Sequence, residues 1–172
     1  MNETLADALA ESQLQTVAEY LLRNVPGLPP IAQSFHILGI AAVMASSVMI
    51  NLRLLGLAVP SQNPSEMIRR LMPWTWGALL VNLVSGSLFV FARPARYFLN
   101  PIFGYKVGML VPAIVLAFVI HRLSLREEGF WDQSDGRRLT AKMVAVVSLV
   151  LWVGIVLAGR WIAYSEYLIY FD

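Results

Sequence analysis

Four long apolar stretches constrain this chain more than any other feature of its sequence. They run over residues 31–59, 71–92, 102–123 and 141–164, and each holds at least the roughly 20 residues with which an α-helix crosses about 30 Å of hydrocarbon. Hydrophobic residues make up 58% of the chain and charged residues only 14%, an imbalance that one soluble core cannot bury. The sequence therefore predicts an all-α integral membrane bundle of four transmembrane helices.

The beginning of the chain is more polar than the rest. Over residues 4–23, apolar positions at helical spacing alternate with acidic and amide residues, and Thr4 with Asp7 resembles a capping box. This pattern predicts an amphipathic helix that lies either on the membrane surface or on the end of the bundle. A proline-rich segment ends it. We therefore divide the chain into a surface helix with its linker, residues 1–30, and a four-helix transmembrane domain, residues 31–172.

The distribution of positive charge predicts the orientation of the chain. The connections after the first and third spans, with their flanks, hold eight lysines and arginines, and the opposite side holds five. The richer side is expected in the cytoplasm, so both termini are predicted on the non-cytoplasmic side. Aromatic residues near the predicted span ends are typical of an interfacial belt: Trp74, Trp76, Trp131, Trp161, Tyr164, Tyr167 and Tyr170.

Ionisable residues inside membrane spans are costly, so each is a candidate for function. Antiparallel spans place His36, Lys106 and Arg160 in an outer layer. Arg53 and His121 fall in an inner layer. The 17 positions from His36 to Arg53 cover roughly 25 Å of helix, so one ligand cannot reach both layers.

The outer layer combines an imidazole with two cations, which would suit haem propionates or a quinone carbonyl. Met44 and Met109 are expected one to two turns deeper than His36 and Lys106. A histidine with a methionine is a known axial pair for haem iron and also a soft ligand set for Cu(I). In the alternative interpretation, the cations extend to the headgroups and the methionines only fill the core.

The inner layer places His121 beside Arg122, Arg53 and Asn51. His121 is either part of a polar site or an interfacial histidine bonded to a backbone carbonyl. Small polar residues predict hydrogen bonds between closely packed helices: Ser46, Ser47, Asn82, Ser85 and Ser87. Glycines predict the same close packing: Gly39, Gly77, Gly86, Gly108, Gly154 and Gly159.

Several function classes find no support in the sequence. The chain has no cysteine, which excludes disulfides, iron–sulfur clusters and thiolate metal sites. All carboxylates fall in predicted tails or loops, and no catalytic triad or HExxH pattern occurs, so no catalytic constellation is expected. A net charge of +2, with no basic-aromatic stripe, argues against nucleic acid as a partner.

Short motifs in a fixed order carry a resemblance to a known family. They are Ser34-Phe35-His36-Ile37-Leu38-Gly39, Asn51-Leu52-Arg53-Leu54-Leu55-Gly56, Pro73-Trp74, Ser85-Gly86, Phe103-x-x-Lys106, His121, Ser148-Leu149-x-Leu151-Trp152 and Gly159-Arg160-Trp161-Ile162. From about residue 31 to residue 164, the chain resembles uncharacterised bacterial four-helix membrane proteins catalogued as a domain of unknown function, DUF6644. It is more distantly similar to copper-resistance D-type membrane domains.

The resemblance implies a bacterial inner membrane and a family polar set formed by His36, Arg53, Lys106, His121 and Arg160. It supplies no activity, substrate or cofactor. Two positions depart from the pattern that the resemblance implies. Asn51 stands where an aspartate is expected, and Val115 or Leu116 where an asparagine is expected. Arg53 thus lacks the charge partner that the family pattern implies.

Three functions remain open at this point. The first is a small redox subunit for electron transport that holds haem b or a quinone through residues of the two layers: His36, Lys106, Arg160, Met109, His121 and Arg53. The second is a copper-handling or transport protein that uses His36, Met44 and Met109. The third is a non-catalytic scaffold subunit. In each case the chain is expected in the lipid bilayer, as a homo-oligomer or beside another membrane subunit.

Overall fold

The computed structural model describes residues 2–127 and 129–164, which are mostly helical and contain no strand. The helices are α1 (Asn2–Ala10), α2 (Gln13–Asn24), α3 (Leu28–Leu54), α4 (Pro64–Ala92), α5 (Pro94–Phe98), α6 (Pro101–Arg126) and α7 (Asp135–Trp161), followed by a 3₁₀ turn (Ile162–Tyr164). Helices α3, α4, α6 and α7 are long and apolar enough to cross a membrane. The predicted all-α bundle of four transmembrane helices is therefore confirmed.

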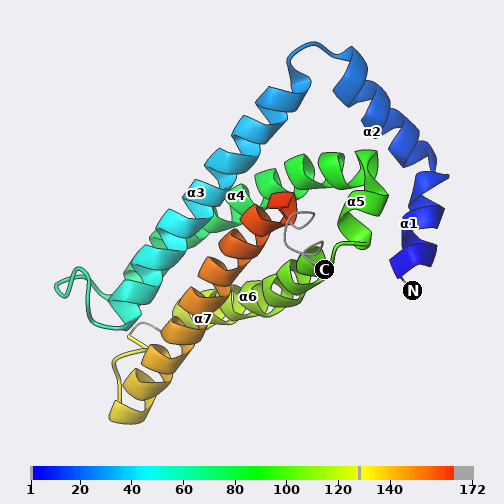
Figure 1. Cartoon of the computed structure of the whole chain (residues 1–172). Coiled ribbons are helices and arrows are strands. Elements are labelled where there is room, and N and C mark those ends of the chain that lie inside the picture. The colour runs from blue at the N-terminus through cyan, green and yellow to red at the C-terminus, as the bar shows by residue number, and fades with distance from the viewer. Residues whose placement is uncertain (1, 128, 165–172) are drawn as a thin grey trace.

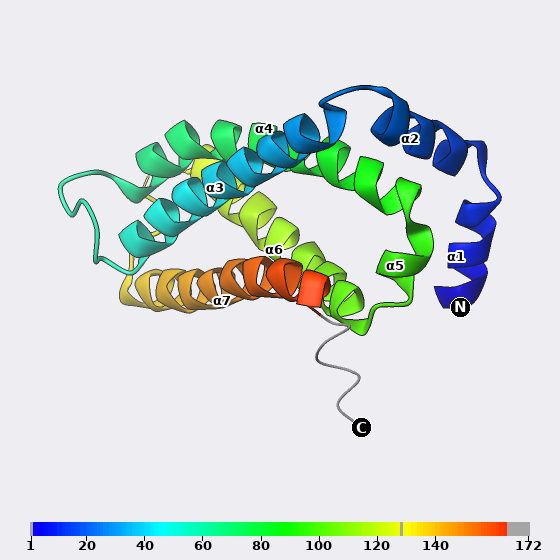
Figure 2. The same ribbon diagram turned by 45° about the horizontal axis from the view of Figure 1, so that its top comes forward.

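The four spans form a ring in which α3 packs on α4, α4 on α6, α6 on α7 and α7 on α3 (Figure 1). Helices α3 and α6 therefore lie diagonally opposite. We call the end with the starts of α3 and α6 the His36 end, and the other the His121 end. The spans lie close together at the His121 end, and α4 diverges from α6 toward the His36 end, where α5 joins them (Figures 1 and 2).

The N-terminal segment packs on the bundle, with α1 against α5 and α2 against α4 (Figure 2). The prediction of one helix over residues 4–23 is wrong, because the helix is interrupted at Ser12. The Ser12 hydroxyl donates to the carbonyl of Leu9 at 2.6 Å and accepts the amide of Gln15 at 3.3 Å, which caps α2. The predicted capping box is also wrong, since Thr4 lies inside α1.

The spans begin earlier than the sequence predicts because prolines occupy their first turns. Helix α4 begins at Pro64 instead of residue 71, and α6 begins at Pro101. The side chains of Asn63 and Asn100 cap these helices by accepting amides two residues ahead, at 2.9 and 3.0 Å. Proline is well tolerated there, because the amide at this position has no partner within the helix.

The connections differ from the prediction for similar local reasons. Helix α3 ends at Leu54 instead of residue 59, and the chain then turns at Gly56, whose φ of 80° favours glycine. Helix α7 starts at Asp135 instead of residue 141, because Ser134 caps it by accepting the amide of Arg137. The short helix α5 lies in a segment predicted as a loop.

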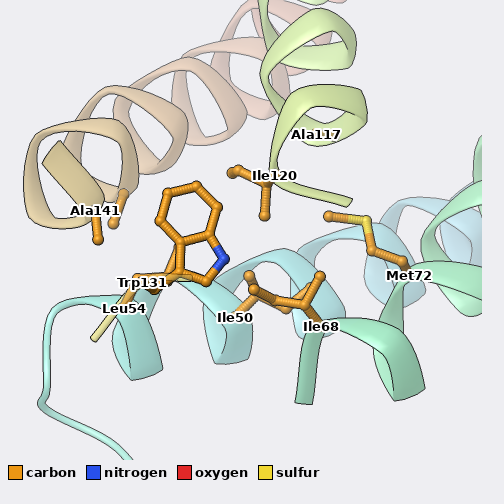
Figure 3. Close-up of a cluster of buried hydrophobic side chains, with 9 residues drawn as sticks. Ile50, Leu54, Ile68, Met72, Ala117, Ile120, Trp131 and Ala141 are labelled. Atoms are coloured by element: carbon orange, nitrogen blue, oxygen red, sulfur yellow. The ribbon is translucent and has the colours of Figure 1, made fainter. Parts of the chain in front are cut away.

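The main hydrophobic cluster lies at the His121 end (Figure 3). It brings together residues of all four spans and the α6–α7 connection: Ile50, Leu54, Ile68, Met72, Ala117, Ile120, Trp131, Ala141 and Ala145. Trp131 is only 2% exposed, and its indole donates to the Ser124 hydroxyl at 2.8 Å. The prediction of Trp131 as an interfacial belt residue is therefore wrong. Trp74 and Trp161 are exposed as predicted, and Tyr167 and Tyr170 lie outside the described residues.

Candidate functional site

His36 lies about two turns into α3, and its ring packs on α4. Its Nδ1 atom lies 2.9 Å from the hydroxyl oxygen of Ser85. Gly86 makes room for the ring, because a Cβ atom there would lie 3.2 Å from His36 Cε1. The adjacent serine and glycine of α4 therefore fix the position of this imidazole.

The hydrogen bonds of Ser85 indicate which nitrogen of His36 carries the proton. The Ser85 hydroxyl donates to the carbonyl of Val81 at 2.7 Å, which uses its only hydrogen. With that assignment, Ser85 accepts from Nδ1–H of His36, and Nε2 carries the lone pair. Among the described residues, the side-chain hydrogen bond of this ring is made by Nδ1, which leaves Nε2 without a side-chain partner. This nitrogen is thus available to accept a hydrogen bond or to ligate a metal.

Asn82 holds α3 and α4 together one turn from Ser85. In the amide orientation that satisfies its hydrogen bonds, Nδ2 donates to the carbonyl of His36 at 2.8 Å and Oδ1 accepts the amide of Ile40 at 3.2 Å. A Cβ atom at Gly39 would lie 2.6 Å from the Asn82 carboxamide. The contact therefore depends on glycine at position 39, and it makes the backbone beside His36 rigid.

Lys106 belongs to the opposite pair of spans. It lies on α6, and its stem packs on α7 at Gly159, where a Cβ atom would lie 3.5 Å from Lys106 Nζ. One turn deeper, a Cβ atom at Gly154 would lie 2.8 Å from Met109 Sδ. The side chains of Lys106 and Met109 thus pack against glycines of α7, and Lys106 is partly buried there.

His36 and Lys106 both lie near the His36 end of the bundle, on the diagonally opposite helices α3 and α6. No carboxylate of the described residues forms an ion pair with Lys106. A partly buried cation with no counter-charge normally faces water or a ligand. One ammonium donor and one imidazole acceptor thus lie at the same end of the bundle.

Arg160, the third residue predicted for the outer layer, points elsewhere. It is exposed, and its guanidinium donates to the Tyr164 hydroxyl at 3.0 Å and lies 5.1 Å from the centre of that ring. This arrangement is typical of an arginine that extends along an aromatic residue toward the membrane interface. The side-chain hydrogen bond of Arg160 therefore goes to Tyr164 and not to His36 or Lys106.

The methionines predicted as metal ligands lie deeper in the bundle. Met44 and Met109 both pack against a second hydrophobic cluster, formed by Val43, Ala78, Ala113, Trp152 and Ile155. Met44 is eight residues beyond His36, about 12 Å along α3. Among the described residues there is no group of three or more histidines, cysteines or carboxylates.

The residues of the predicted inner layer do not form one group. His121 accepts a hydrogen bond from the Trp76 indole at 3.1 Å, which joins α6 to α4. Arg53 instead binds the loop between α3 and α4, since its Nε donates a hydrogen bond to the carbonyl of Gln62 at 2.6 Å. Arg122 is exposed and lies over the Phe118 ring. The Trp76–His121 pair could not be predicted from the sequence, because only the contact between α4 and α6 brings these residues together.

Most of the small polar residues act between helices as predicted. Ser46 accepts the Thr75 hydroxyl at 2.7 Å, in addition to the contacts of Ser85 and Asn82. Ser47 and Ser87 are exceptions, because the Ser47 hydroxyl bonds to no described residue and the Ser87 hydroxyl donates to Val84 within α4. Gly77 and Gly108 are also exceptions, since a Cβ atom at either position would meet nothing within 4 Å.

The fold and the site define a four-helix integral membrane protein with a polar site near one end of its spans. Residues 19–165 match the model of a family of unknown function, DUF6644, and the chain belongs to this family. The predicted resemblance to DUF6644 is therefore confirmed, and the looser similarity to copper-resistance D-type domains stays a prediction. No curated protein and no solved structure matches the chain.

Proposed function

We propose that the protein is a small redox subunit of the membrane that binds a quinone, or the corresponding hydroquinone, at the His36 end. The observation that carries this proposal is the presence of His36 and Lys106 at the same end of two diagonally opposite spans, where no described carboxylate forms an ion pair with Lys106. A quinone carbonyl accepts hydrogen bonds, and a hydroquinone hydroxyl also donates one. An ammonium and an imidazole with a free lone pair match these two needs.

The surroundings of the site also suit a lipid-soluble ligand. Ser85 and Gly86 hold the imidazole, while Gly159 receives the stem of Lys106, so each polar group is supported by one pair of spans. Mostly apolar helices surround the site, and an isoprenoid tail can extend between them into the bilayer. Small-molecule sites commonly combine an apolar lining with a few fixed polar groups.

Haem b is the alternative cofactor within the same proposal. Metal-bound histidines usually donate their other ring N–H to a neighbouring oxygen, which is the relation between His36 Nδ1 and Ser85. Nε2 of His36 would then bind the iron, and Met109, on the opposite span, would be the candidate second ligand. We prefer the quinone because Met109 packs in the second hydrophobic cluster, whereas Lys106 is unpaired among the described residues.

A scaffold function is the second candidate, favoured by the polar contacts between spans. The pairs His36–Ser85, Thr75–Ser46, Trp76–His121 and Asn51–Ser148 all join different helices. Such bonds would lock a bundle that only supports other subunits. The copper function finds less support, since Met44 and Met109 lie in the hydrophobic cluster.

Location and assembly belong to the same proposal. The excess of lysine and arginine at the His121 end favours that end as the cytoplasmic side, with both termini outside, in a bacterial inner membrane. A redox subunit needs a partner that supplies or takes electrons, so we expect association with another membrane subunit or with a second copy.

The test is the chemical content of the purified protein. Absorbance spectra of oxidised and dithionite-reduced samples are compared, and solvent extracts of the same samples are analysed for quinone. We expect about one quinone per chain and no Soret band. A Soret band that is lost in His36→Ala would replace the quinone with haem. Protein without quinone, haem or metal would contradict the redox proposal and leave the scaffold function.

A further inference from the structure

A small cavity with three polar residues in its wall lies where all four spans meet, far from the site at the His36 end. Its volume is about 10 Å³. Ser47, Asn51 and Ser148 form its polar wall, and Met72, Ala117 and Trp152 contribute to its apolar wall. Asn51 lies 15 residues beyond His36, roughly 22 Å along α3, so the cavity and the His36 end lie at different depths of the bundle.

Asn51 is the central polar group of this cavity. Its side chain is only 1% exposed, and its Nδ2 donates to the Ser148 hydroxyl at 3.0 Å, which joins α3 to α7. Its Oδ1 atom is buried and has no hydrogen-bond partner among the described residues. A buried carbonyl oxygen that accepts no hydrogen bond is unfavourable. Because Asn51 Oδ1 lies beside a cavity, we expect a ligand there that donates a hydrogen bond to it.

Two hydroxyls complete the polar wall. Ser47 lies one turn before Asn51 on the same face of α3, and its hydroxyl forms no hydrogen bond with any described residue. Ser148 accepts from Asn51, and no acceptor for its own hydrogen occurs in the described part of the chain. One acceptor and two hydroxyls therefore border the same small space.

We propose that this cavity binds one water molecule, which bridges α3 and α7. The water donates to Asn51 Oδ1, and it exchanges hydrogen bonds with the hydroxyls of Ser47 and Ser148. A cavity of about 10–15 Å³ holds a single water molecule. Buried waters typically form about three hydrogen bonds. A metal cation fits less well, because no carboxylate lines the cavity and its walls are largely apolar.

The experiment is nuclear magnetic resonance of the protein in lipid nanodiscs, with ¹⁵N-labelled asparagine. Cross-relaxation between water and each side-chain amide reports water bound for longer than bulk exchange allows. The Asn51 signal is identified by its loss in Asn51→Leu, or by sequential assignment if that variant fails to fold. Asn82 is the matched control, since both ends of its amide bond to the backbone of α3.

The expected result is a long-lived water signal at the Asn51 amide and none at the Asn82 amide. Absence of the signal at Asn51 would overturn the proposal, because the cavity would then be dry. Equal signals at both amides would also overturn it, since they would indicate general penetration of water between the spans instead of one bound molecule.

Discussion

The Nδ1 atom of His36 lies 2.9 Å from the Ser85 hydroxyl, and this contact joins α3 to α4 at the proposed ligand site. It fixes the orientation of the ring and, through the bond from Ser85 to Val81, leaves the Nε2 lone pair available. The chemistry of the site therefore depends on a serine that belongs to a different span from the histidine.

Substitution of Ser85 by alanine tests this contact. Ser85→Ala removes a hydrogen bond between membrane helices, which on average is worth about 0.6 kcal/mol and at most about 1.7 kcal/mol. We expect a small loss of unfolding free energy, measured by denaturation in mixed micelles, together with a loss of ligand affinity. Ser87→Ala is the control, because Ser87 bonds only within α4. Equal effects of the two variants would contradict the role of Ser85.

The close contact of α3 and α4 at Gly39 gives a second prediction. Gly39→Ala places a methyl group 2.6 Å from the Asn82 carboxamide, so the two helices must separate or Asn82 must lose its bonds to α3. Overpacking of this kind costs about 1–3 kcal/mol, measurable in the same denaturation assay. Gly77→Ala is the matched control, because it meets nothing within 4 Å. Retention of full stability in Gly39→Ala would show that the contact is not needed.

Trp131 should contribute strongly to stability although it lies in a connection between spans. Its ring fills the centre of the cluster at the His121 end (Figure 3). Trp131→Ala should therefore cost about 3–5 kcal/mol, the usual range for a buried tryptophan. Trp74 is 71% exposed, so Trp74→Ala should change the thermal midpoint little in detergent. Similar midpoints for the two variants would contradict the burial of Trp131.

A carboxylate at the start of the α6–α7 connection, Glu127, should make stability weakly dependent on pH. Gln133 donates to the Glu127 carboxylate at 2.8 Å and Arg137 donates at 3.0 Å, and these bonds hold the pKa of Glu127 below its usual value. A lowered folded pKa stabilises the protein above the unfolded pKa, and this contribution disappears as the pH falls through the folded value.

Glu127→Gln measures that contribution. Because Glu127 is exposed and solvent screens its charge, we expect only a slightly lower thermal midpoint than in the wild type near pH 7. The difference should vanish as the pH is lowered below the folded pKa. A difference that persists unchanged at low pH would have to come from something other than the charge of Glu127.

The sequence predicts the four spans well, because length and apolar content directly determine which segments can cross a bilayer. The predicted starts of α4 and α6 are too late, because Pro64 and Pro101 are assigned to the connections between spans. Proline is in fact favoured in the first turn of a helix. The division of the N-terminal helix depends on Ser12, a residue that also occurs within helices.

The candidate site is predicted only in part. His36 and Lys106 are recognisable because ionisable residues are rare in apolar spans. Their surroundings depend on which helices are neighbours, and periodicity carries no such information. The surroundings of Trp131 could not be predicted either, because its burial requires the α6–α7 connection to pack against the ends of the spans. Nor could those of Trp76, which bonds to His121 where α4 contacts α6.

The most direct test of the proposed function is equilibrium binding of a short-chain quinone to the purified protein, with empty micelles as the reference. We predict saturable binding at about one site per chain. His36→Ala should weaken it about 2- to 13-fold, because it removes a hydrogen bond worth about 0.5–1.5 kcal/mol. Lys106→Met should weaken it more than about 10-fold, because a hydrogen bond from a charged group is worth about 1.5–3 kcal/mol. His121→Ala is the matched control and should bind as the wild type. Binding that does not saturate, or that is unchanged in His36→Ala, would contradict a quinone site at the His36 end.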